Sequence, residues 1–475
     1  MTSVFSKWAL PAMAAFASLA AVSQLNWVYD HHRQVELPLR LLAGILIGGI
    51  LGAVVWRLDE LIRHKALSPE HLENTRATAA WSFLPFLFVW LWFFHIPFFF
   101  VWGTALAVIG HGILRLPIGR KTGSIRNLVP HWLSADALGK KGDLVFYILC
   151  CLLFAYSGFA LVAAFPHFGN NAFDLGIQAG AARSSVFRGT FYTDAMNMNF
   201  MGDHFSPSLF LVGLAFLIWD NGAVALIFQN LSLFFCVLVA YALAKEVLKS
   251  RPLAMFMAFL LMINPYFHWM NQYEFHAEVA FGPLILFGLL WTLEKLSFER
   301  KSHWLVLILL SLAGLTVKED LPLVIGCFGF WWFLSRPGKR LPGLYLWLVG
   351  AAGFLVTAKL LIPYFSGGVY THLPRYSNLG HSPEEILKTI LTRPMYVYSQ
   401  IDWNPVRNFM ETFVYLPFFA PWTILSGFAP IFYNEISSSN AQHIFFGQYS
   451  YPVTPFVFYA ALYGLHFLLP RPVDP

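Results

Sequence analysis

The chain has 475 residues, of which 57% are hydrophobic and only 12% are charged, and its formal net charge is +6. Soluble globular domains carry roughly 25% charged residues, so this composition excludes an ordinary soluble protein. The excess of Lys and Arg lies in short connections between apolar runs, which is typical of a membrane protein, and we expect no nucleic-acid partner.

Apolar runs of about 15–25 residues recur along the chain, the length that crosses a hydrocarbon core of ~30 Å as a helix. The runs are continuous and do not alternate, which favours helices over the strands of a barrel. We therefore expect an all-α, polytopic transmembrane bundle that crosses the bilayer about ten or more times. The expected apolar segments are 8–28, 38–56, 80–94, 97–115, 144–165, 206–219, 222–243, 252–264, 277–295, 303–317, 321–335, 342–362, 411–432 and 452–469.

Basic residues predict the orientation of these segments. The clusters within 57–76, 115–141, 245–251, 295–301 and 336–340 should all be cytoplasmic. This orientation requires 206–219, which follows directly after a long outer segment, to lie in the outer interface without crossing. Segment 411–432 contains Pro417, Pro421 and Pro430 and is expected to be a broken hairpin.

Two long segments, 166–205 and 363–410, are then left on the non-cytoplasmic side, where long loops are usually functional. Polar residues gather on that side in four places. They are Asp174, Gln178, Arg183, Asp203 and His204 in the first segment, then His276 and Glu278, then Lys318, Glu319 and Asp320, and finally Gln448 and Tyr449. Charge at the membrane boundary costs several kcal/mol unless it is paired or hydrated. The triplet 318–320 is therefore either an ion-paired hairpin tip or one wall of an aqueous site.

Four motifs occur in order: Phe-Asp-Leu-Gly-Ile-Gln from Phe173, Gly-Asp-His-Phe-Ser-Pro from Gly202, Phe-His-x-Glu from Phe275, and Lys-Glu-Asp from Lys318. With these motifs, residues 144–470 resemble a bacterial family of polytopic membrane proteins that is catalogued as a domain of unknown function. That family is grouped with the GT-C glycosyltransferases. We expect a GT-C-like region over 144–475, whereas 1–143 forms N-terminal transmembrane helices outside the resemblance.

The resemblance implies an inverting glycosyltransferase of the bacterial inner membrane. It would move a sugar from a polyprenyl-phosphate donor to a cell-envelope glycan, lipid or protein at the periplasmic face. The implied catalytic residues are Asp174 as general base, Asp203, His204 and Glu319. The residues predicted to bind the donor, from their place on the outer side, are Gln178, Arg183, His276, Glu278, Lys318, Asp320, Gln448 and Tyr449. A carboxylate at a low-dielectric boundary has a raised pKa, which makes it a better base.

No spacing in the sequence assigns a metal site. The sequence leaves open whether Asp174, Asp203 and Glu319 hold a divalent cation, Mg²⁺ or Mn²⁺. The main alternative to an enzyme is a transporter or flippase for a lipid-linked or small anionic substrate, which would place its polar residues near the midplane on broken helices of repeated halves. A non-catalytic scaffold is a third alternative. Because the polar residues gather in outer loops and the halves do not repeat, we favour the enzyme.

Overall fold

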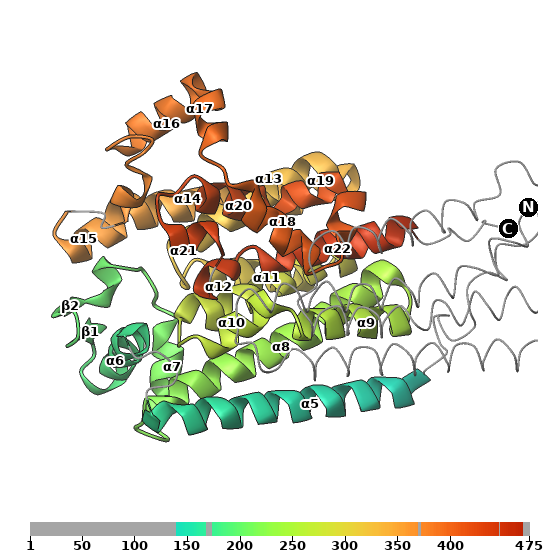
Figure 1. Cartoon of the computed structure of the whole chain (residues 1–475), viewed down its shortest axis with the longest axis horizontal. Coiled ribbons are helices and arrows are strands. Elements are labelled where there is room, and N and C mark those ends of the chain that lie inside the picture. Colours follow the sequence, from blue (N-terminus) through green and yellow to red (C-terminus); the bar gives the residue numbers. More distant parts are fainter. Residues whose placement is uncertain (1–138, 168–172, 369–371, 446, 469–475) are drawn as a thin grey trace, which may run out of the picture. The chain divides into compact units, whose positions relative to one another are not determined.

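The computed structural model describes residues 139–167, 173–368, 372–445 and 447–468 (Figure 1). The predicted segments 8–28, 38–56, 80–94 and 97–115 lie outside these residues. The described part is mostly helical, as predicted. It contains one small antiparallel sheet, in which β1 (Tyr192–Thr193) pairs with β2 (Met198–Asn199).

Among the described residues, four helical runs are long and apolar enough to cross a membrane. They are α5 (Gly139–Ala164), α8 (Ala223–Leu248), α11 (Ala277–Lys295) and the run Pro337–Ser366, which contains η5 (Pro337–Lys339), α14 (Arg340–Val356), the π-helical turn η6 (Thr357–Leu361) and α15 (Ile362–Ser366). The pair α9 (Arg251–Met262) and α10 (Pro265–Gln272), bent by 51°, can form a fifth span. Continuous apolar runs form helices because a helix satisfies its backbone internally.

Shorter elements complete the described unit. Helices α12 (Lys301–Gly314) and α13 (Asp320–Ser335) are apolar but shorter than a full span, and α22 (Thr454–Leu468) packs against α8 and α11. The remaining elements are η3 (Phe165–His167), α6 (Phe173–Phe187), η4 (Phe200–Gly202), α7 (Leu209–Phe216), η7 (Leu373–Tyr376), α16 (Pro383–Thr392), α17 (Pro394–Ser399), α18 (Trp403–Glu411), η8 (Leu416–Phe419), α19 (Pro421–Ile424), η9 (Leu425–Gly427), α20 (Phe428–Glu435), α21 (Asn440–His443) and η10 (Gly447–Ser450).

The segment 206–219 contains no helix long enough to cross a membrane, in agreement with the prediction, and its place in the outer interface stays a prediction. Its helix α7 has eight residues, which is about 12 Å of helix, whereas a crossing needs about 20 residues. Large apolar side chains on and after α7, among them Leu217 and Ile218, are exposed. The segment 411–432 is divided among η8, α19, η9 and α20, so the predicted interruption is confirmed, with breaks at Pro417 and Pro421, whereas Pro430 lies within α20.

Helices α13 and α14 pack with their backbones almost in contact. A Cβ atom on Gly350 would lie 2.3 Å from the backbone nitrogen of Gly326. Lipid is as apolar as the side chains, so association of membrane helices depends on close packing and favours small residues at the contact. This contact holds α13 in place, and with it the side chains at its first turn.

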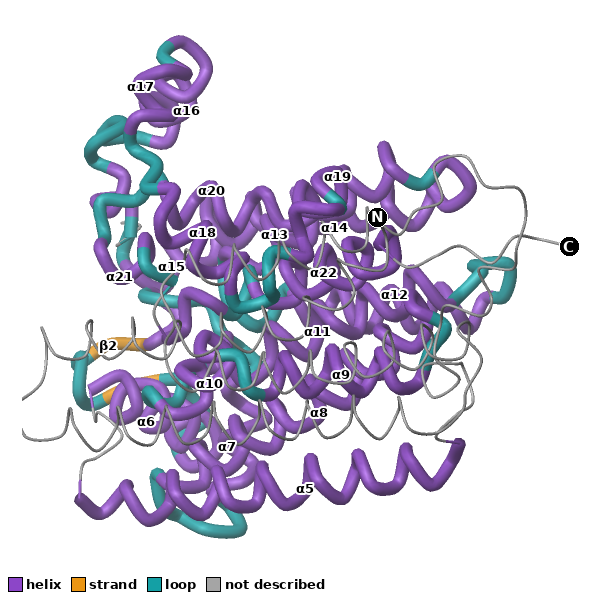
Figure 2. The backbone as a smooth tube through the Cα atoms, turned by 45° about the vertical axis from the view of Figure 1, so that its right-hand side comes forward, coloured by secondary structure: helices purple, strands orange, loops and turns teal. Residues whose placement is uncertain are grey.

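Three of the basic clusters lie at the same end of the long helices. At one end, where α11 and α13 begin, lie α6, α7, α15 and α21 (Figures 1 and 2). At the other end, Glu294 of α11 accepts a hydrogen bond from Arg336 at 3.0 Å, and Lys295 pairs with Glu246 at 2.8 Å. The basic clusters 245–251, 295–301 and 336–340 thus share one end, as one common membrane side requires. That this side is cytoplasmic stays a prediction.

Candidate functional site

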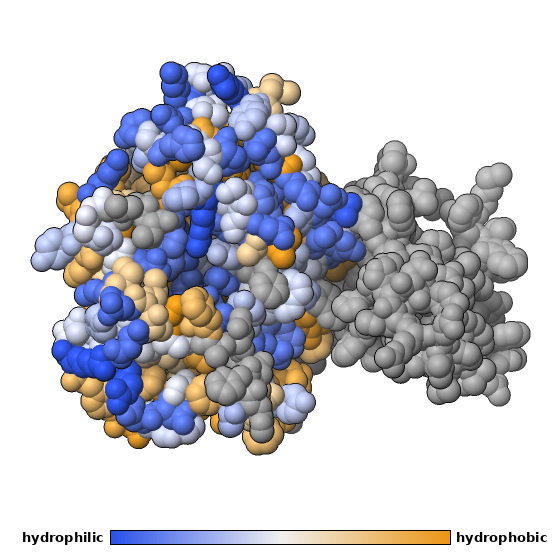
Figure 3. Space-filling view, turned by 60° about the vertical axis from the view of Figure 1, so that its left-hand side comes forward, coloured by the Kyte–Doolittle hydropathy of each residue, from blue (hydrophilic) through white to orange (hydrophobic). Residues whose placement is uncertain are grey.

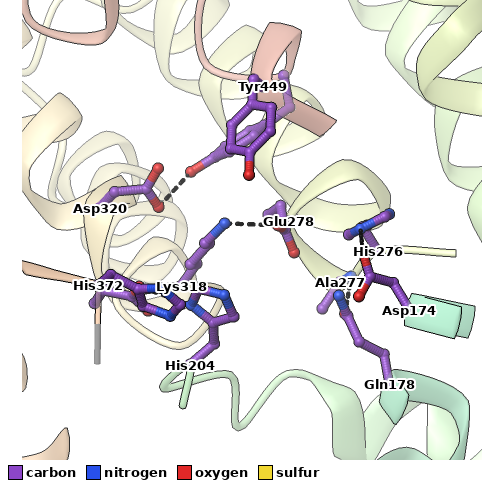
Figure 4. A network of polar contacts seen from close by, with 12 residues as sticks. Asp174, Gln178, His204, His276, Ala277, Glu278, Lys318, Asp320, His372 and Tyr449 are labelled. Atoms are coloured by element: carbon purple, nitrogen blue, oxygen red, sulfur yellow. Dashed lines mark hydrogen bonds and ion pairs between the residues drawn. The ribbon is translucent and has the colours of Figure 1, made fainter. Parts of the chain in front are cut away.

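Three of the predicted carboxylates lie at the beginnings of three helices (Figure 4). Asp174 is in the first turn of α6, Glu278 is in the first turn of α11, and Asp320 begins α13. The first backbone N–H groups of a helix have no partner within it, and they favour negative charge nearby. Helix geometry therefore gathers carboxylates at this end. Figure 3 shows hydrophilic side chains along the middle of this end of the unit, around a hollow.

The first cluster, called here the Asp174 group, consists of Asp174, Glu274 and His276. The Nε2 atom of His276 lies 3.2 Å from Oδ2 of Asp174. The His276 side chain is 3% exposed, whereas that of Asp174 is 36% exposed. Glu274 is buried and accepts a hydrogen bond from the backbone N–H of Leu175 at 3.0 Å. Burial raises the pKa of Glu274, and the Leu175 N–H opposes this rise. A buried imidazole thus orients a partly exposed carboxylate.

Two glutamines support this group from behind. Gln178 accepts a hydrogen bond from the backbone N–H of Ala277 at 2.8 Å, and Gln229 accepts one from that of His276 at 2.9 Å. The amide of Gln229 also donates to the carbonyl oxygens of Met270 and Glu274. Gln178, predicted to bind the donor, therefore satisfies the beginning of α11. We did not predict Gln229, although a polar residue inside an apolar run is itself a signal because it is costly there.

A buried ion pair lies at the centre of the site. Nζ of Lys318 is 2.7 Å from Oε1 of Glu278, and the two side chains are 9% and 4% exposed. Burial alone would lower the pKa of Lys318, but the carboxylates of Glu278, Asp320 and Glu319 raise it, so the ammonium stays charged. Leaving either partner alone at this depth would cost several kcal/mol.

Asp320 is held by two phenols. Its carboxylate accepts hydrogen bonds from Tyr451 at 2.7 Å and from Tyr433 at 2.8 Å. Tyr433 was not predicted, because it directly follows the broken segment 411–432, where nothing in the sequence distinguishes it from other aromatic residues. Each charged side chain of the 318–320 triplet therefore has a partner within the protein.

The second cluster, called here the Asp203 group, consists of Asp203, His204, Glu319 and His372. Nδ1 of His204 lies 2.8 Å from Oε1 of Glu319. The imidazole of His204 stacks on that of His372, with ring centroids 4.2 Å apart and planes 9° apart. The carboxylate of Asp203 lies 3.9 Å from Nε2 of His204 and 3.3 Å from Nε2 of His372. His372 was not predicted, because a lone histidine in a long outer segment carries no signal.

The charges of the Asp203 group are coupled. Burial alone would raise the pKa of Glu319, but His204 and Lys318 lower it to about 2. Burial alone would lower the pKa of His204, but Glu319 outweighs burial and raises it. Burial and the neighbouring His204 lower the pKa of His372. The expectation that a boundary carboxylate has a raised pKa is therefore wrong for Glu319.

The central ion pair adjoins both groups along the chain. Glu278 is two residues from His276 in sequence, and Lys318 precedes Glu319 directly. The predicted residues Asp174, Asp203, His204, His276, Glu278, Lys318, Glu319 and Asp320 thus lie in sets of contacts that adjoin one another along the chain at one end of the bundle, and we call them the polar network (Figure 4).

The three remaining predicted residues lie at the edge of this network or outside it. Arg183 makes two hydrogen bonds to Asp220, at 2.6 and 2.7 Å, so among the described residues its charge is used elsewhere. Tyr449 lies above Lys318 and Glu278 in Figure 4 and accepts a hydrogen bond from Arg375 at 3.4 Å. The side-chain oxygen of Gln448 is buried and has no hydrogen-bond partner in the described part of the chain.

The sequence left open a divalent cation held jointly by Asp174, Asp203 and Glu319. In the structure these three residues do not form one ligand group. Within the described ranges, two sets of possible ligand atoms lie within 4.8 Å of one another. One contains Asp174, Glu274 and His276, and the other contains Asp203, His204 and His372. Asp174 and Asp203 are therefore in different sets, each of which is completed by a histidine.

Comparison with known proteins identifies the family. The model of the family described as "Predicted membrane protein (DUF2079)" matches residues 167–470, more than half of the chain and every residue of the polar network. No curated protein matches the chain. The grouping with GT-C glycosyltransferases is no part of this match. The chain belongs to the DUF2079 family of membrane proteins.

Proposed function

We propose that this protein is an inverting glycosyltransferase of the bacterial inner membrane, with a GT-C-like bundle and its active site at the periplasmic face. The donor would be a sugar on polyprenyl phosphate, and the acceptor a hydroxyl of a cell-envelope glycan, lipid or protein. The observation that carries the proposal is the polar network at one end of apolar helices. A lipid-linked donor dissolved in the membrane would present its phosphate and sugar at that level.

Asp174 is the proposed general base. In an inverting transfer, the acceptor oxygen attacks the anomeric carbon from the face opposite the phosphate and gives up its proton. Asp174 is the carboxylate of its group that reaches solvent, and His276 fixes its orientation. Glu319 is a poorer candidate, because a carboxylate whose pKa is lowered to about 2 has little tendency to take a proton.

The leaving polyprenyl phosphate carries negative charge that needs donors. Lys318 has three N–H donors, of which Glu278 uses one. Tyr449, with Arg375 beside it, lies on the same side of the network. These three residues are the proposed phosphate contacts, and Arg183, paired with Asp220, is not among them.

One observation favours the transporter alternative. Helices α9 and α10 are bent by 51°, and broken helices at mid-membrane often form transport sites. At this bend, however, Asn264 caps α10 and is buried, and its amide donates to Thr412 at 2.7 Å. The backbone N–H groups of Tyr266 and Phe267 at the break are also bound by the Asn264 side chain, so the protein itself satisfies the break, which supports the enzyme over the transporter.

The test is sugar transfer by the purified full-length protein. It would be incubated with polyprenyl-phosphate sugars labelled in the sugar, together with cell-envelope acceptors, and the products separated. We expect label to move to the acceptor with inversion at the anomeric carbon. Flux of a lipid-linked or anionic substrate into vesicles, without transfer from any lipid-linked donor, would reject the enzyme in favour of the transporter.

A further inference from the structure

The geometry points to a binding site for a transition-metal dication, Zn²⁺ by its ligand chemistry, formed by Asp203, His204 and His372. Each offers one ligand atom, and the three atoms lie within 4.8 Å of one another. Zn²⁺ binds imidazole nitrogen and carboxylate oxygen at about 2.0–2.2 Å. Ligand atoms in this range of separation can share one ion once the two stacked imidazoles turn their nitrogen atoms toward it. Two imidazoles favour Zn²⁺ over Mg²⁺, which prefers oxygen ligands.

The position of Glu319 supports this assignment. It contacts Nδ1 of His204 at 2.8 Å, so the other ring nitrogen, Nε2, is the one directed at Asp203. In metal sites, a ligating histidine usually donates its second N–H to a carboxylate, which fixes the ring and makes the nitrogen more basic. The Glu319–His204 contact has this arrangement. A bound ion would take the place of a proton on Nε2 of His204.

A second, independent observation is the unused oxygen of Glu319. The residue is 3% exposed, and its Oε2 atom has no hydrogen-bond partner among the described residues. A buried carboxylate oxygen without a partner costs free energy. It can be satisfied by an ion or by a water that the ion holds.

The charges nearby also favour a cation. Asp203, Glu278, Glu319 and Asp320 bring four carboxylates to this region, and Lys318 is the single ammonium paired among them. Removing charge from water is costly unless it is balanced. A dication beside Asp203 would balance two of these charges, and it would also reduce the repulsion that an anionic ligand meets here.

The Asp174 group offers the same residue types but is a weaker candidate. It has one imidazole where the Asp203 group has two, and its buried Glu274 already accepts the Leu175 N–H at 3.0 Å. An ion there would have to replace contacts that the protein makes by itself. We therefore assign the metal to the Asp203 group alone. This inference does not depend on the proposed function, because binding can be measured without turnover.

The experiment measures Zn²⁺ bound to the purified full-length protein in detergent. The protein would be stripped with a chelator, dialysed against Zn²⁺ alone, and analysed for metal per chain. We expect one tightly bound ion per chain and a rise in the unfolding temperature when Zn²⁺ is added. Mg²⁺ at the same concentration should give neither effect. Binding of Mg²⁺ but not Zn²⁺ would overturn the assignment.

Variants locate the ion. His372→Ala should lower the affinity for Zn²⁺ more than tenfold, and Glu319→Gln should lower it about 10–100-fold, the range seen when a carboxylate that orients a ligating histidine is lost. His381→Ala, an exposed histidine of the same outer segment, is the matched control and should bind as wild type. Glu319→Gln decides the question if His372→Ala does not fold. Tight, stoichiometric Zn²⁺ binding by a folded His372→Ala or Glu319→Gln protein would contradict the site. Wild-type protein that binds no more Zn²⁺ than background would contradict it as well.

Discussion

The Asp174 group and the Asp203 group are built from the same residue types but use their nitrogen atoms differently. In the Asp174 group, Nε2 of the buried His276 faces Asp174 at 3.2 Å, and its backbone N–H is bound by Gln229. In the Asp203 group, His204 uses Nδ1 for Glu319, and its Nε2 lies 3.9 Å from Asp203, beyond hydrogen-bonding distance. The direct contact to Asp203, at 3.3 Å, comes from His372, so this group brings two imidazoles to one carboxylate where the Asp174 group brings one.

This difference separates two kinds of chemistry. A carboxylate held by a histidine and partly exposed to solvent is suited to accept a proton from a substrate. Converging imidazole and carboxylate atoms beside a buried, unsatisfied oxygen are suited to hold a cation. The same residue types can therefore serve proton transfer in one group and charge balance in the other. Which of the two a group serves depends on its geometry and burial.

The largest expected effect is that of Asp174→Asn on turnover. The amide keeps the size of the side chain and most of its hydrogen bonds, but it cannot accept a proton. General-base catalysis contributes about 10²–10⁴-fold, so kcat should fall by at least that range, while the affinity for the polyprenyl-phosphate donor should change little.

The measurement is sugar transfer and donor binding by Asp174→Asn beside wild type. Asp194→Asn is the control, because Asp194 pairs with Arg188 in an exposed contact of the same outer segment. Full turnover by Asp174→Asn would move the base to another carboxylate of the network. Bound Zn²⁺ should be unchanged in this variant, and loss of the metal would erase the distinction between the two groups.

The second prediction concerns the ion pair that joins the groups. Lys318→Met leaves Glu278 as a buried charge without a partner, which should cost about 3–5 kcal/mol of unfolding free energy and weaken donor binding. Adding Glu278→Gln should recover part of the stability but not the donor binding. The free energy can be measured by unfolding in mixed detergent micelles.

The matched control is Arg188→Met, which removes an exposed pair with Asp194. Such surface pairs contribute about 0–1 kcal/mol, so this loss should be small. Equal losses for Lys318→Met and Arg188→Met would mean that the central pair is hydrated and does not act as a buried link.

The smallest expected effect tests how the Asp203 group is held together. A Cβ atom on Gly202 would lie 2.8 Å from the backbone carbon of Phe365, at the end of the helix that leads to His372. Gly202→Ala should therefore push the two segments apart, cost about 1–3 kcal/mol, and weaken Zn²⁺ binding.

Gly176→Ala is the control within the Asp174 group. Its Cβ atom would meet nothing within 4 Å on α6, so the helix should gain about 0.5–1 kcal/mol. Unfolding of both variants, followed beside their Zn²⁺ content, checks the pair. Unchanged Zn²⁺ affinity in Gly202→Ala would show that the close approach to Phe365 does not position the ligands.

The long helices could be predicted because their apolar runs carry the signal themselves. The predicted segment 277–295 coincides with α11, and 144–165 matches α5 apart from a few residues at its beginning. Helix α10 was not predicted, because its polar sequence around His268 and Asn271 does not resemble a membrane segment. The short helices between α15 and α22 depend on tertiary contacts and prolines, which apolar periodicity does not report.

The site was predictable where costly charges stand in motifs, as in Lys318 to Asp320. It was not predictable where the partner lies far along the chain. Nothing near His372 indicates that it stacks on His204, and nothing near Tyr433 indicates that it binds Asp320. Gln178 and Arg183 were assigned to the donor from their position in the outer segment, but their contacts to Ala277 and Asp220 depend on the fold.

The most direct measurement is an experimental structure of the protein with bound polyprenyl phosphate. The account predicts the phosphate at the end of the bundle where α6, α11 and α13 begin, in hydrogen-bonding distance of Lys318 or Tyr449, with Asp174 facing the place of the sugar. A phosphate bound at the opposite end, among the basic residues near Arg336, or at the bend between α9 and α10, would contradict it.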